Sequence, residues 1–247
     1  MKKIVAYTAL HYGKEYLHSA IQSVIDFVDE YHVLYATQPS HGTRSNAVNP
    51  DSKQDLLAIA VNAAGSKLNW HEGNWLYENH QREAIYELAS NAQCILVLDS
   101  DEIWDTQCLQ LVQDEINYQG FQIKLPLLHY WRSFYKAVMH DPAAPGRVLF
   151  PNGNRQLSLT ADVESYHLHH FGYAQSVKTI QYKMQIHGHL NEFRKDCDWY
   201  KDIFLANRQT DCHPVGSQFW NTEDVNPDVL LPDFMKQHKN YHKALIE

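Results

Sequence analysis

Two carboxylates separated by one residue, Asp99 and Asp101, directly follow the apolar run 94–98. This run shows no polar–apolar alternation, as is typical of a parallel strand covered on both faces. In open α/β sheets, ligands bind just outside the carboxyl ends of the strands. Two close carboxylates with no basic residue nearby in sequence repel each other unless a cation joins them, and hard oxygen ligands suit Mg²⁺ or Mn²⁺. The pattern predicts a divalent-metal site, although an acidic loop that caps the next helix also fits it.

A βαβ unit at the start of the chain would position this pair. The apolar segment 3–10 predicts a strand, and 32–37 predicts a second one. Between them, apolar residues recur three and four positions apart over 14–30, which indicates an amphipathic helix. Strand, helix and strand in this order predict a parallel sheet.

The rest of the chain predicts further elements around that unit. We expect helices at 54–64, 78–91, 192–208 and 230–239, strands at 94–98, 121–128 and 182–187, and a loop-rich segment at 130–160. The expected fold class is α/β, with a mixed, mainly parallel sheet flanked by helices. With no repeat or linker, we expect one domain over 1–247, made of a βα-repeating half (1–105) and a more irregular half (106–247).

Composition excludes several classes of protein. The formal charge of −8 over 247 residues disfavours a non-specific nucleic-acid binder. Four scattered cysteines form no CxxC pair, which argues against a zinc ribbon or a disulfide scaffold. No run reaches the ~18 apolar residues of a transmembrane span, and the N-terminal apolar run is too short for a signal peptide. A cytoplasmic location is therefore expected.

The sequence resembles the GT-A glycosyltransferases, especially bacterial and viral members of the family 2 type. Four stretches carry the resemblance in the family's order: 5–17 with 23–24, 40–43, 79–84 and 96–102. The last, Leu-Val-Leu-Asp-Ser-Asp-Glu, matches the family's metal-binding motif closely. The second is a degraded form of the Asp-x-x-Ser-x-Asp-Gly-Thr turn, with Gln38 and Pro39 where acidic residues often contact the nucleoside.

The resemblance implies a donor half over 1–105, an acceptor half over 106–247 and roles for individual residues. Thr8, Ala9 and Gln38 would line the nucleoside pocket, and Arg82 would face the diphosphate or support the Asp99 loop. By the same resemblance, Asp101 would bind the metal directly. Asp99, with Ser100 beside it, would contact the ribose or the metal.

A histidine cluster in the second half is the other candidate for the metal site, because GT-A enzymes often complete that site with a histidine. In an extended strand, His167 and His169 share a face while His170 points to the opposite one. We expect His170, or else His169, as a ligand, which would favour Mn²⁺ over Mg²⁺. Two alternatives stay open: histidines that pack within a half-buried strand, and a zinc hydrolase that uses His167, His169 and His187 or His189.

The acceptor side offers weaker signals. An inverting transferase needs a carboxylate base. Glu223 and Asp224 resemble the pair that serves this role in some family members, and Glu164 competes with them. Without a base, a retaining mechanism is open. The aromatic segment 128–135 is a candidate sugar-stacking wall, although core packing is the more frequent fate of such residues. Four basic residues could contact phosphate, with a solvated face as the default: Arg147, Lys178, Lys183 and Arg194.

The sequence thus predicts a metal-dependent glycosyltransferase that moves a sugar from a nucleotide-diphosphate donor to a glycan or other hydroxyl acceptor. UDP is the nucleotide that the resemblance implies. The alternatives are a sugar nucleotidyltransferase, which lacks its usual Gly-rich loop here, an aspartyl-nucleophile phosphatase, and a non-catalytic sugar-binding module on the same fold.

Overall fold

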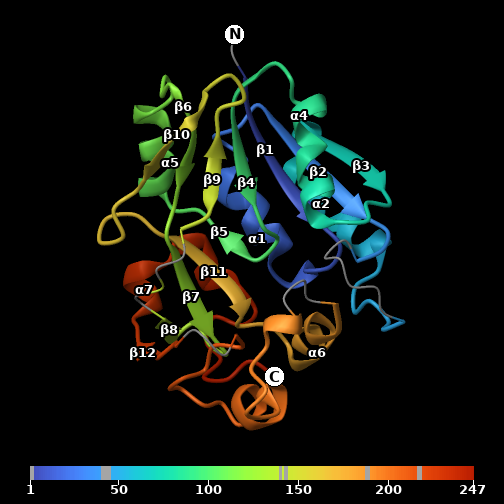
Figure 1. Ribbon diagram of the computed structural model, residues 1–247, viewed down its shortest axis with the longest axis vertical. Coiled ribbons are helices and arrows are strands. Elements are labelled where there is room, and N and C mark those ends of the chain that lie inside the picture. Colours follow the sequence, from blue (N-terminus) through green and yellow to red (C-terminus); the bar gives the residue numbers. More distant parts are fainter. Residues whose placement is uncertain (1–2, 40–45, 139–140, 142–143, 187–189, 216–218) are drawn as a thin grey trace.

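The computed structural model describes residues 3–39, 46–138, 141, 144–186, 190–215 and 219–247 (Figure 1). Its strands form two sheets. The larger has seven strands in the order β10-β6-β9-β4-β1-β2-β3, and the smaller has five in the order β12-β8-β7-β11-β5. Figure 1 shows the smaller sheet below the larger one, at the end where β4 finishes. Loop 40–43, part of the predicted nucleoside turn, lies outside the described residues, as do His187 and His189.

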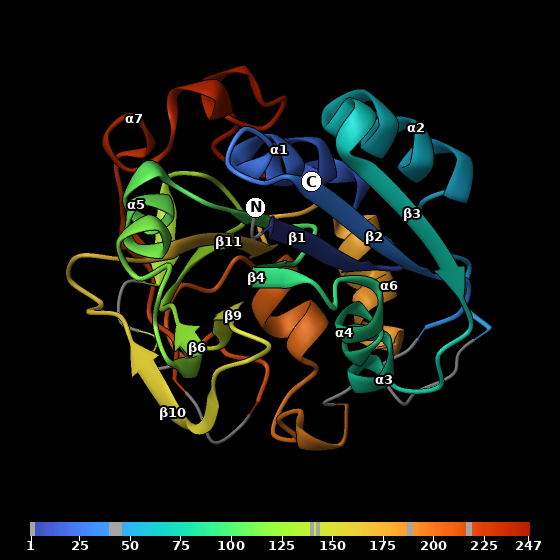
Figure 2. The ribbon, with the colours of Figure 1, turned by 90° about the horizontal axis from the view of Figure 1, so that it is seen from above.

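The N-terminal half is a parallel βα array, as predicted. Its strands are β1 (Lys3–Leu10), β2 (Glu30–Ala36), β3 (Leu68–Gly73) and β4 (Ala92–Leu98), and its helices are α1 (Lys14–Val24), α2 (Lys53–Ala64), α3 (Glu78–Glu83) and α4 (Ile85–Leu88). Strand β1 pairs in parallel with β2 and with β4, and β2 pairs in parallel with β3. Helices α1 and α2 cover one face of the sheet, and α3 and α4 cover the other (Figure 2).

Two of the predicted helices are shorter than their patterns. The helix predicted over 14–30 ends at Val24, yet Ile25 and Val28 are buried in the turns that follow it. These two buried residues continue the helical spacing of apolar positions in the sequence, although the chain at these positions is no longer helical. The helix predicted over 78–91 is divided at Ala84 into α3 and α4. Strand β3 was not predicted.

Four predictions between residues 121 and 208 are wrong. The strand predicted over 121–128 is two strands in different sheets, β6 (Gly120–Lys124) and β7 (Leu127–Trp131), separated at Pro126, whose nitrogen cannot donate to a ladder. The predicted loop 130–160 contains β8 (Lys136–Val138), β9 (Gly146–Leu149) and β10 (Asn154–Thr160). Residues 182–186 of the predicted strand 182–187 are instead part of helix α6 (Val177–Ile186). No single helix covers 192–208, where the structure has the end of the 3-10 turn Leu190–Glu192 and the π-helical Trp199–Leu205.

The remaining elements lie in both halves of the chain. They are β5 (Glu102–Ile103), α5 (Thr106–Asp114), β11 (Leu168–Tyr173), β12 (Glu223–Asp224), α7 (Pro227–Leu230) and the 3-10 turns Gly65–Lys67 and Asp233–Gln237. The predicted C-terminal helix is therefore two short turns. Strand β11 pairs in parallel with β7 and antiparallel with β5. Behind it, the rings of Tyr130 and Phe171 stack with their centroids 4.5 Å apart in an aromatic core.

These features confirm the expected fold class, a mixed and mainly parallel α/β sheet flanked by helices. Within the described ranges, no helix has both the length and the hydropathy to cross a bilayer. The division into a donor half and an acceptor half stays a prediction.

Candidate active site

The acidic residues lie where the first sheet meets the second. Thr8 on β1 pairs with Val33 on β2 and with Leu98 on β4, so these parallel strands end at one edge. Asp99 follows Leu98, and a turn in which the Glu102 N–H donates to the Asp99 carbonyl at 3.1 Å leads into β5. Figure 1 shows the carboxyl end of β4 directed at β5 and β11. The placement predicted for the acidic motif is therefore what the structure shows.

Arginines neutralise one side of this turn, which we call the arginine side: Asp99, Glu102, Arg82 and Arg147. Arg82 donates to Asp99 Oδ1 at 2.6 Å, and Arg147 donates to Asp99 Oδ2 at 2.8 Å. Arg147 also pairs with Glu102, which is fully buried. Burial by itself would raise the pKa of Asp99, but Arg82 and Arg147 outweigh it and hold that pKa far below its ordinary range. Burial raises the pKa of Glu102, against the pull of Arg147.

Local structure explains how both arginines reach Asp99. Arg82 lies on α3, where Glu78 one turn earlier accepts from its Nε atom at 2.7 Å. Arg147 is the second residue of strand β9, which runs antiparallel to β4 and therefore starts near the end of β4. The default of a solvated face is wrong for Arg147, whose side chain is only 9% exposed. The sequence also gave no sign that Asp99 has cationic partners, because these lie 17 and 48 residues away.

The other side of the turn, which we call the histidine side, consists of Asp101, His170, Gln175 and Lys183. His170 Nε2 lies 3.6 Å from Asp101 Oδ1. Gln175 donates its amide to Asp101 Oδ2 at 2.7 Å. Burial raises the pKa of Asp101, partly opposed by the positive charge of Lys183. Lys183 is half-buried, with its ammonium 4.6 Å from the centroid of the Tyr173 ring.

Pairing between β5 and β11 brings the histidine to the aspartate. His170 pairs with Glu102 across this antiparallel ladder, and the Phe171 N–H donates to the Asp101 carbonyl at 2.8 Å. Gly172 leaves room for the ring, because a Cβ atom there would lie 2.6 Å from His170 Nε2. A glycine at position 172 is therefore needed for the position that the His170 ring takes in the site.

The neighbouring histidines face the other way, as the alternation of a strand requires. His169 is fully buried, with Nδ1 3.2 Å from the Tyr130 hydroxyl and Nε2 4.0 Å from Asp105. The His167 ring lies beside it, with centroids 5.2 Å apart. Burial lowers the pKa of His169 to about 3. The structure thus brings His170, and not His169, to Asp101, and the role predicted for His169 has no geometric support.

A close approach ties the first helix to the acidic turn. Gly13, the N-cap of α1, has φ +119°, and a Cβ atom there would lie 2.1 Å from Ser100 Oγ. The N–H groups of Gly13 and Lys14 donate to the Asp51 carboxylate at 2.7 and 3.0 Å. The N-terminus of α1 is therefore capped by a carboxylate of the chain itself.

The predicted nucleoside residues lie at the same sheet edge. Thr8 is buried, and its hydroxyl lies 2.5 Å from that of Tyr31, so this hydroxyl is already engaged. Ala9 is half-buried, and Gln38 is exposed just beyond β2. Backbone contacts from Thr8 and Ala9 stay a prediction.

The predicted bases are not brought to Asp101. Glu223 and Asp224 form β12, at the opposite edge of the second sheet from β5, where Asp224 pairs with Lys136 at 2.6 Å. Three strand spacings separate β12 from β11, which amounts to about 14 Å. Glu164 is exposed in the turn that precedes β11. None of the three carries geometric support as a base.

The other second-half candidates separate in the same way. Tyr130 and Trp131 are core residues, whereas Tyr135 is partly exposed. Lys178 is exposed, and Arg194 pairs with Asp196 and Asp211. The cysteines are all free.

The donor atoms present suit a metal that takes the rest of its ligands from a substrate. Asp101 and His170 supply one oxygen and one imidazole nitrogen, a set acceptable to Mn²⁺. The parts of the chain that the structure describes contain no group of three or more His, Cys, Asp or Glu side chains able to hold a metal. Both Asp99 oxygens already accept from arginines, so Asp101 and His170 are the better candidates.

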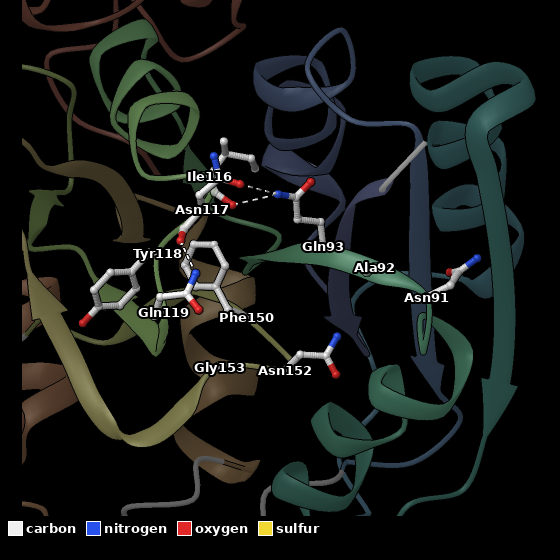
Figure 3. A pocket seen from close by; sticks show the side chains of 10 residues that line it. All are labelled: Asn91, Ala92, Gln93, Ile116, Asn117, Tyr118, Gln119, Phe150, Asn152 and Gly153. Carbon is white, nitrogen blue, oxygen red and sulfur yellow. Dashed lines mark hydrogen bonds between the residues drawn. The ribbon is translucent and has the colours of Figure 1, made fainter.

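A pocket of about 220 Å³ lies at the other end of β4 (Figure 3). No charged side chain lines it, and five of the lining residues carry carboxamides: Asn91, Gln93, Asn117, Gln119 and Asn152. Some of these amides bond within the wall, as Gln93 Nε2 does to the Ile116 carbonyl at 2.9 Å. With no carboxylate, imidazole or thiol among its lining residues, this pocket offers no acidic, histidine or cysteine ligand for a metal.

The sequence interpretation missed several residues around Asp101. Gln175, His129 and Asp141 are buried polar residues that reach the site directly or through His170. His129 stands in the aromatic segment 128–135, and no spacing in the sequence connects it with position 170. Their proximity depends on the pairing of β7 with β11.

No protein-family model matches the chain, and no curated protein matches it. Among solved structures, it is similar to S. aureus TarS 1-349 (TM-score 0.46, 12% identity, 69% of this chain and 60% of that one) and to S. aureus TarS (0.45, 13%, 85% and 43%). It is also similar to glucosyl-3-phosphoglycerate synthase from Mycobacterium tuberculosis in complex with Mn²⁺, UDP-glucose and phosphoglyceric acid (0.30, 18%, 53% and 44%). The chain spans less than two thirds of the length of each. At these TM-scores and identities, the likenesses assign no function to this chain.

Proposed function

We propose that this protein is a metal-dependent glycosyltransferase that moves a sugar from a nucleotide-diphosphate donor to a hydroxyl acceptor. One observation carries the proposal. Asp101, at the carboxyl end of the central strand β4, faces the imidazole of His170 across 3.6 Å. That edge is where open α/β sheets bind their ligands.

The charges around the turn support a need for a cation. On the arginine side, two guanidiniums balance the carboxylates of Asp99 and Glu102. On the histidine side, Lys183 balances Asp101 but leaves no surplus. A diphosphate brings about two further negative charges, which a divalent ion would neutralise. When bound, such an ion supplies Lewis-acid stabilisation of the leaving diphosphate.

The chain's own residues would hold and orient the donor. Asp101 and His170 would hold the metal, and the amide of Gln175 keeps the Asp101 carboxylate in one orientation. Lys183 would add a fixed positive charge beside the diphosphate. Both carboxylate oxygens of Asp99 already accept hydrogen bonds from arginines. Asp99 would therefore contribute chiefly by stabilising the conformation of this turn.

The nucleoside would lie against the ends of β1 and β2, near Thr8, Ala9 and Gln38. We take UDP as the nucleotide and a glycan or another hydroxyl compound as the acceptor, on the resemblance to GT-A enzymes. We assign no base to Glu164, Glu223 or Asp224, so the proposal covers donor binding and activation.

A donor-hydrolysis assay tests the proposal. UDP release from UDP-glucose and related donors is measured with Mn²⁺, with Mg²⁺ and in EDTA, for the wild type and for Asp101→Ala. We expect release only with metal and only in the wild type, whereas Asp114→Ala, an exposed carboxylate on α5, serves as the matched control. Full UDP release in EDTA, or by Asp101→Ala, would contradict the proposal. Pyrophosphate production from UTP and a sugar phosphate would identify a nucleotidyltransferase instead.

A further inference from the structure

A row of four side chains leads inward from the proposed metal site: Asp101, His170, His129 and Asp141. His170 Nε2 lies 3.6 Å from Asp101 Oδ1, and its Nδ1 lies 2.7 Å from Nδ1 of His129. On the far side, His129 Nε2 lies 3.0 Å from Asp141 Oδ2. His129 and Asp141 are both buried, on β7 and on the segment after β8. The row therefore connects the site with the buried carboxylate of Asp141.

The inner end of the row has a fixed polarity. An ionised carboxylate only accepts hydrogen bonds. The indole of Trp220 donates to Asp141 Oδ2 at 3.0 Å and holds that oxygen next to His129. The Nε2 atom of His129 is buried and makes no aligned hydrogen bond with any described residue, and the Asp141 carboxylate, 3.0 Å away, is the acceptor beside it. The proton of a neutral His129 therefore belongs on Nε2.

That polarity propagates to His170. With its proton on Nε2, a neutral His129 offers only a lone pair at Nδ1. The short contact between the two Nδ1 atoms then requires His170 to donate from its own Nδ1. The Nε2 atom of His170 is left with a lone pair directed at Asp101.

The outer distance agrees with this arrangement. A protonated Nε2 facing a carboxylate would close to about 2.7–2.9 Å, the length of a charge-assisted hydrogen bond. The observed 3.6 Å exceeds that length and leaves a gap between two electron-pair donors. Gln175 donates to Oδ2, the other oxygen of Asp101, and so holds the carboxylate in place on its side of the gap.

We propose that His129 and Asp141 are positioning residues that fix the tautomer of His170, so that its Nε2 lone pair faces Asp101. The purpose of this relay rests on the proposed metal-dependent function, but the tautomer is a property of the metal-free chain. Outer partners of metal-binding histidines commonly set ring orientation and tautomer in this way, and their loss costs about 10–100-fold in metal affinity.

The first experiment is an NMR measurement of imidazole ¹⁵N shifts in the metal-free, full-length protein, with His170 assigned by comparison with His170→Gln. We expect a protonated Nδ1 and an unprotonated Nε2 on His170. In Asp141→Asn, the amide can donate to His129 Nε2, which reverses the row and moves the His170 proton to Nε2. Asp162→Asn, an exposed carboxylate in the turn before β11, is the matched control and should leave the spectrum unchanged. A wild-type His170 protonated at Nε2 overturns the inference.

The second experiment measures Mn²⁺ affinity by paramagnetic resonance in the presence of UDP. Asp141→Asn should weaken binding about 10–100-fold. His129→Gln can still accept from His170 and donate to Asp141, so it should retain affinity that His129→Leu loses. Equal losses in both, with melting curves unchanged, would contradict the relay. If the wild type shows the expected tautomer but binds no Mn²⁺, the relay stands and the metal-dependent function fails.

Discussion

The two sides of the turn 99–102 differ in which side chains lie against their aspartates. On the arginine side, two guanidiniums reach Asp99 at 2.6 and 2.8 Å, and one of them also pairs with Glu102. On the histidine side, Asp101 faces a neutral ring across 3.6 Å. Two aspartates of one motif, separated by a single serine, therefore have different environments.

The difference suggests that the arginine side stabilises the fold and that the histidine side binds ligands. A buried carboxylate that is fully paired contributes to the folded structure, because removal of its partner leaves an uncompensated charge. A carboxylate held beside an electron-pair donor has capacity left for a cation. We therefore expect variants on the arginine side to alter stability first, and variants on the histidine side to alter metal and donor binding first.

The largest expected effect is on the arginine side. Arg147→Met leaves Glu102 buried without its guanidinium partner, and the free energy of unfolding should fall by about 3–5 kcal/mol. Denaturant titration checks this. The double variant Arg147→Met with Glu102→Gln removes both charges and should recover part of the loss. A loss below about 1 kcal/mol in the single variant would show that the pair is not a stabilising contact.

The next effect is on the histidine side. Asp101→Asn keeps the shape of the side chain but removes its charge, and donor turnover with Mn²⁺ should fall about 100–1000-fold, by analogy with the loss of other charge-stabilising groups. Its unfolding free energy should stay close to that of the wild type. If Asp101→Asn unfolds the protein while Arg147→Met leaves it stable, the comparison is reversed.

The two histidines on opposite faces of β11 allow a pH test. Burial lowers the pKa of His169 to about 3, below the ordinary unfolded value near 6.5. The unfolded chain thus binds more protons between these values, so the stability contribution is complete above pH 6.5 and is lost as pH falls. Between pH 7 and pH 5 this residue alone should cost about 2 kcal/mol. In His169→Phe, the free energy of unfolding should fall less between pH 7 and pH 5 than in the wild type. An equal fall in both proteins would argue against a buried neutral ring at position 169.

The smallest effect is expected at the far end of β4. Gln119→Ala in the uncharged pocket of Figure 3 removes an exposed amide and should change stability by less than about 0.5 kcal/mol. Donor turnover should not change. A clear loss of turnover would extend the active region to this end of the sheet.

Local pattern was enough to predict strands β1, β2 and β4 of the first sheet and the position of Asp99 and Asp101, because a buried parallel strand and an amphipathic helix are properties of short segments. It also predicted that His170 and His169 face opposite sides of a strand. It could not predict the arginine side, since Arg82 and Arg147 meet Asp99 only after α3 and β9 pack on β4. Strands β8 and β9, one in each sheet, were missed for a similar reason, because such short strands are defined by their neighbours.

The partners of His170 show the same limit. His129 and Asp141 are separated from it by 41 and 29 positions and carry no motif, so only the pairing of β7 with β11 brings them together. Gly172 is similar. Its role is the space it leaves for the His170 ring, which no sequence pattern reveals.

The central claim is that Asp101 and His170 hold a divalent metal that a nucleotide diphosphate completes. Calorimetric titration of UDP into the wild type and into Asp101→Asn, each with Mn²⁺ and with EDTA, tests it most directly. The account predicts binding only for the wild type with Mn²⁺, and a heat signal near zero in the other three titrations. Equal UDP affinity in EDTA, or in Asp101→Asn, would contradict it.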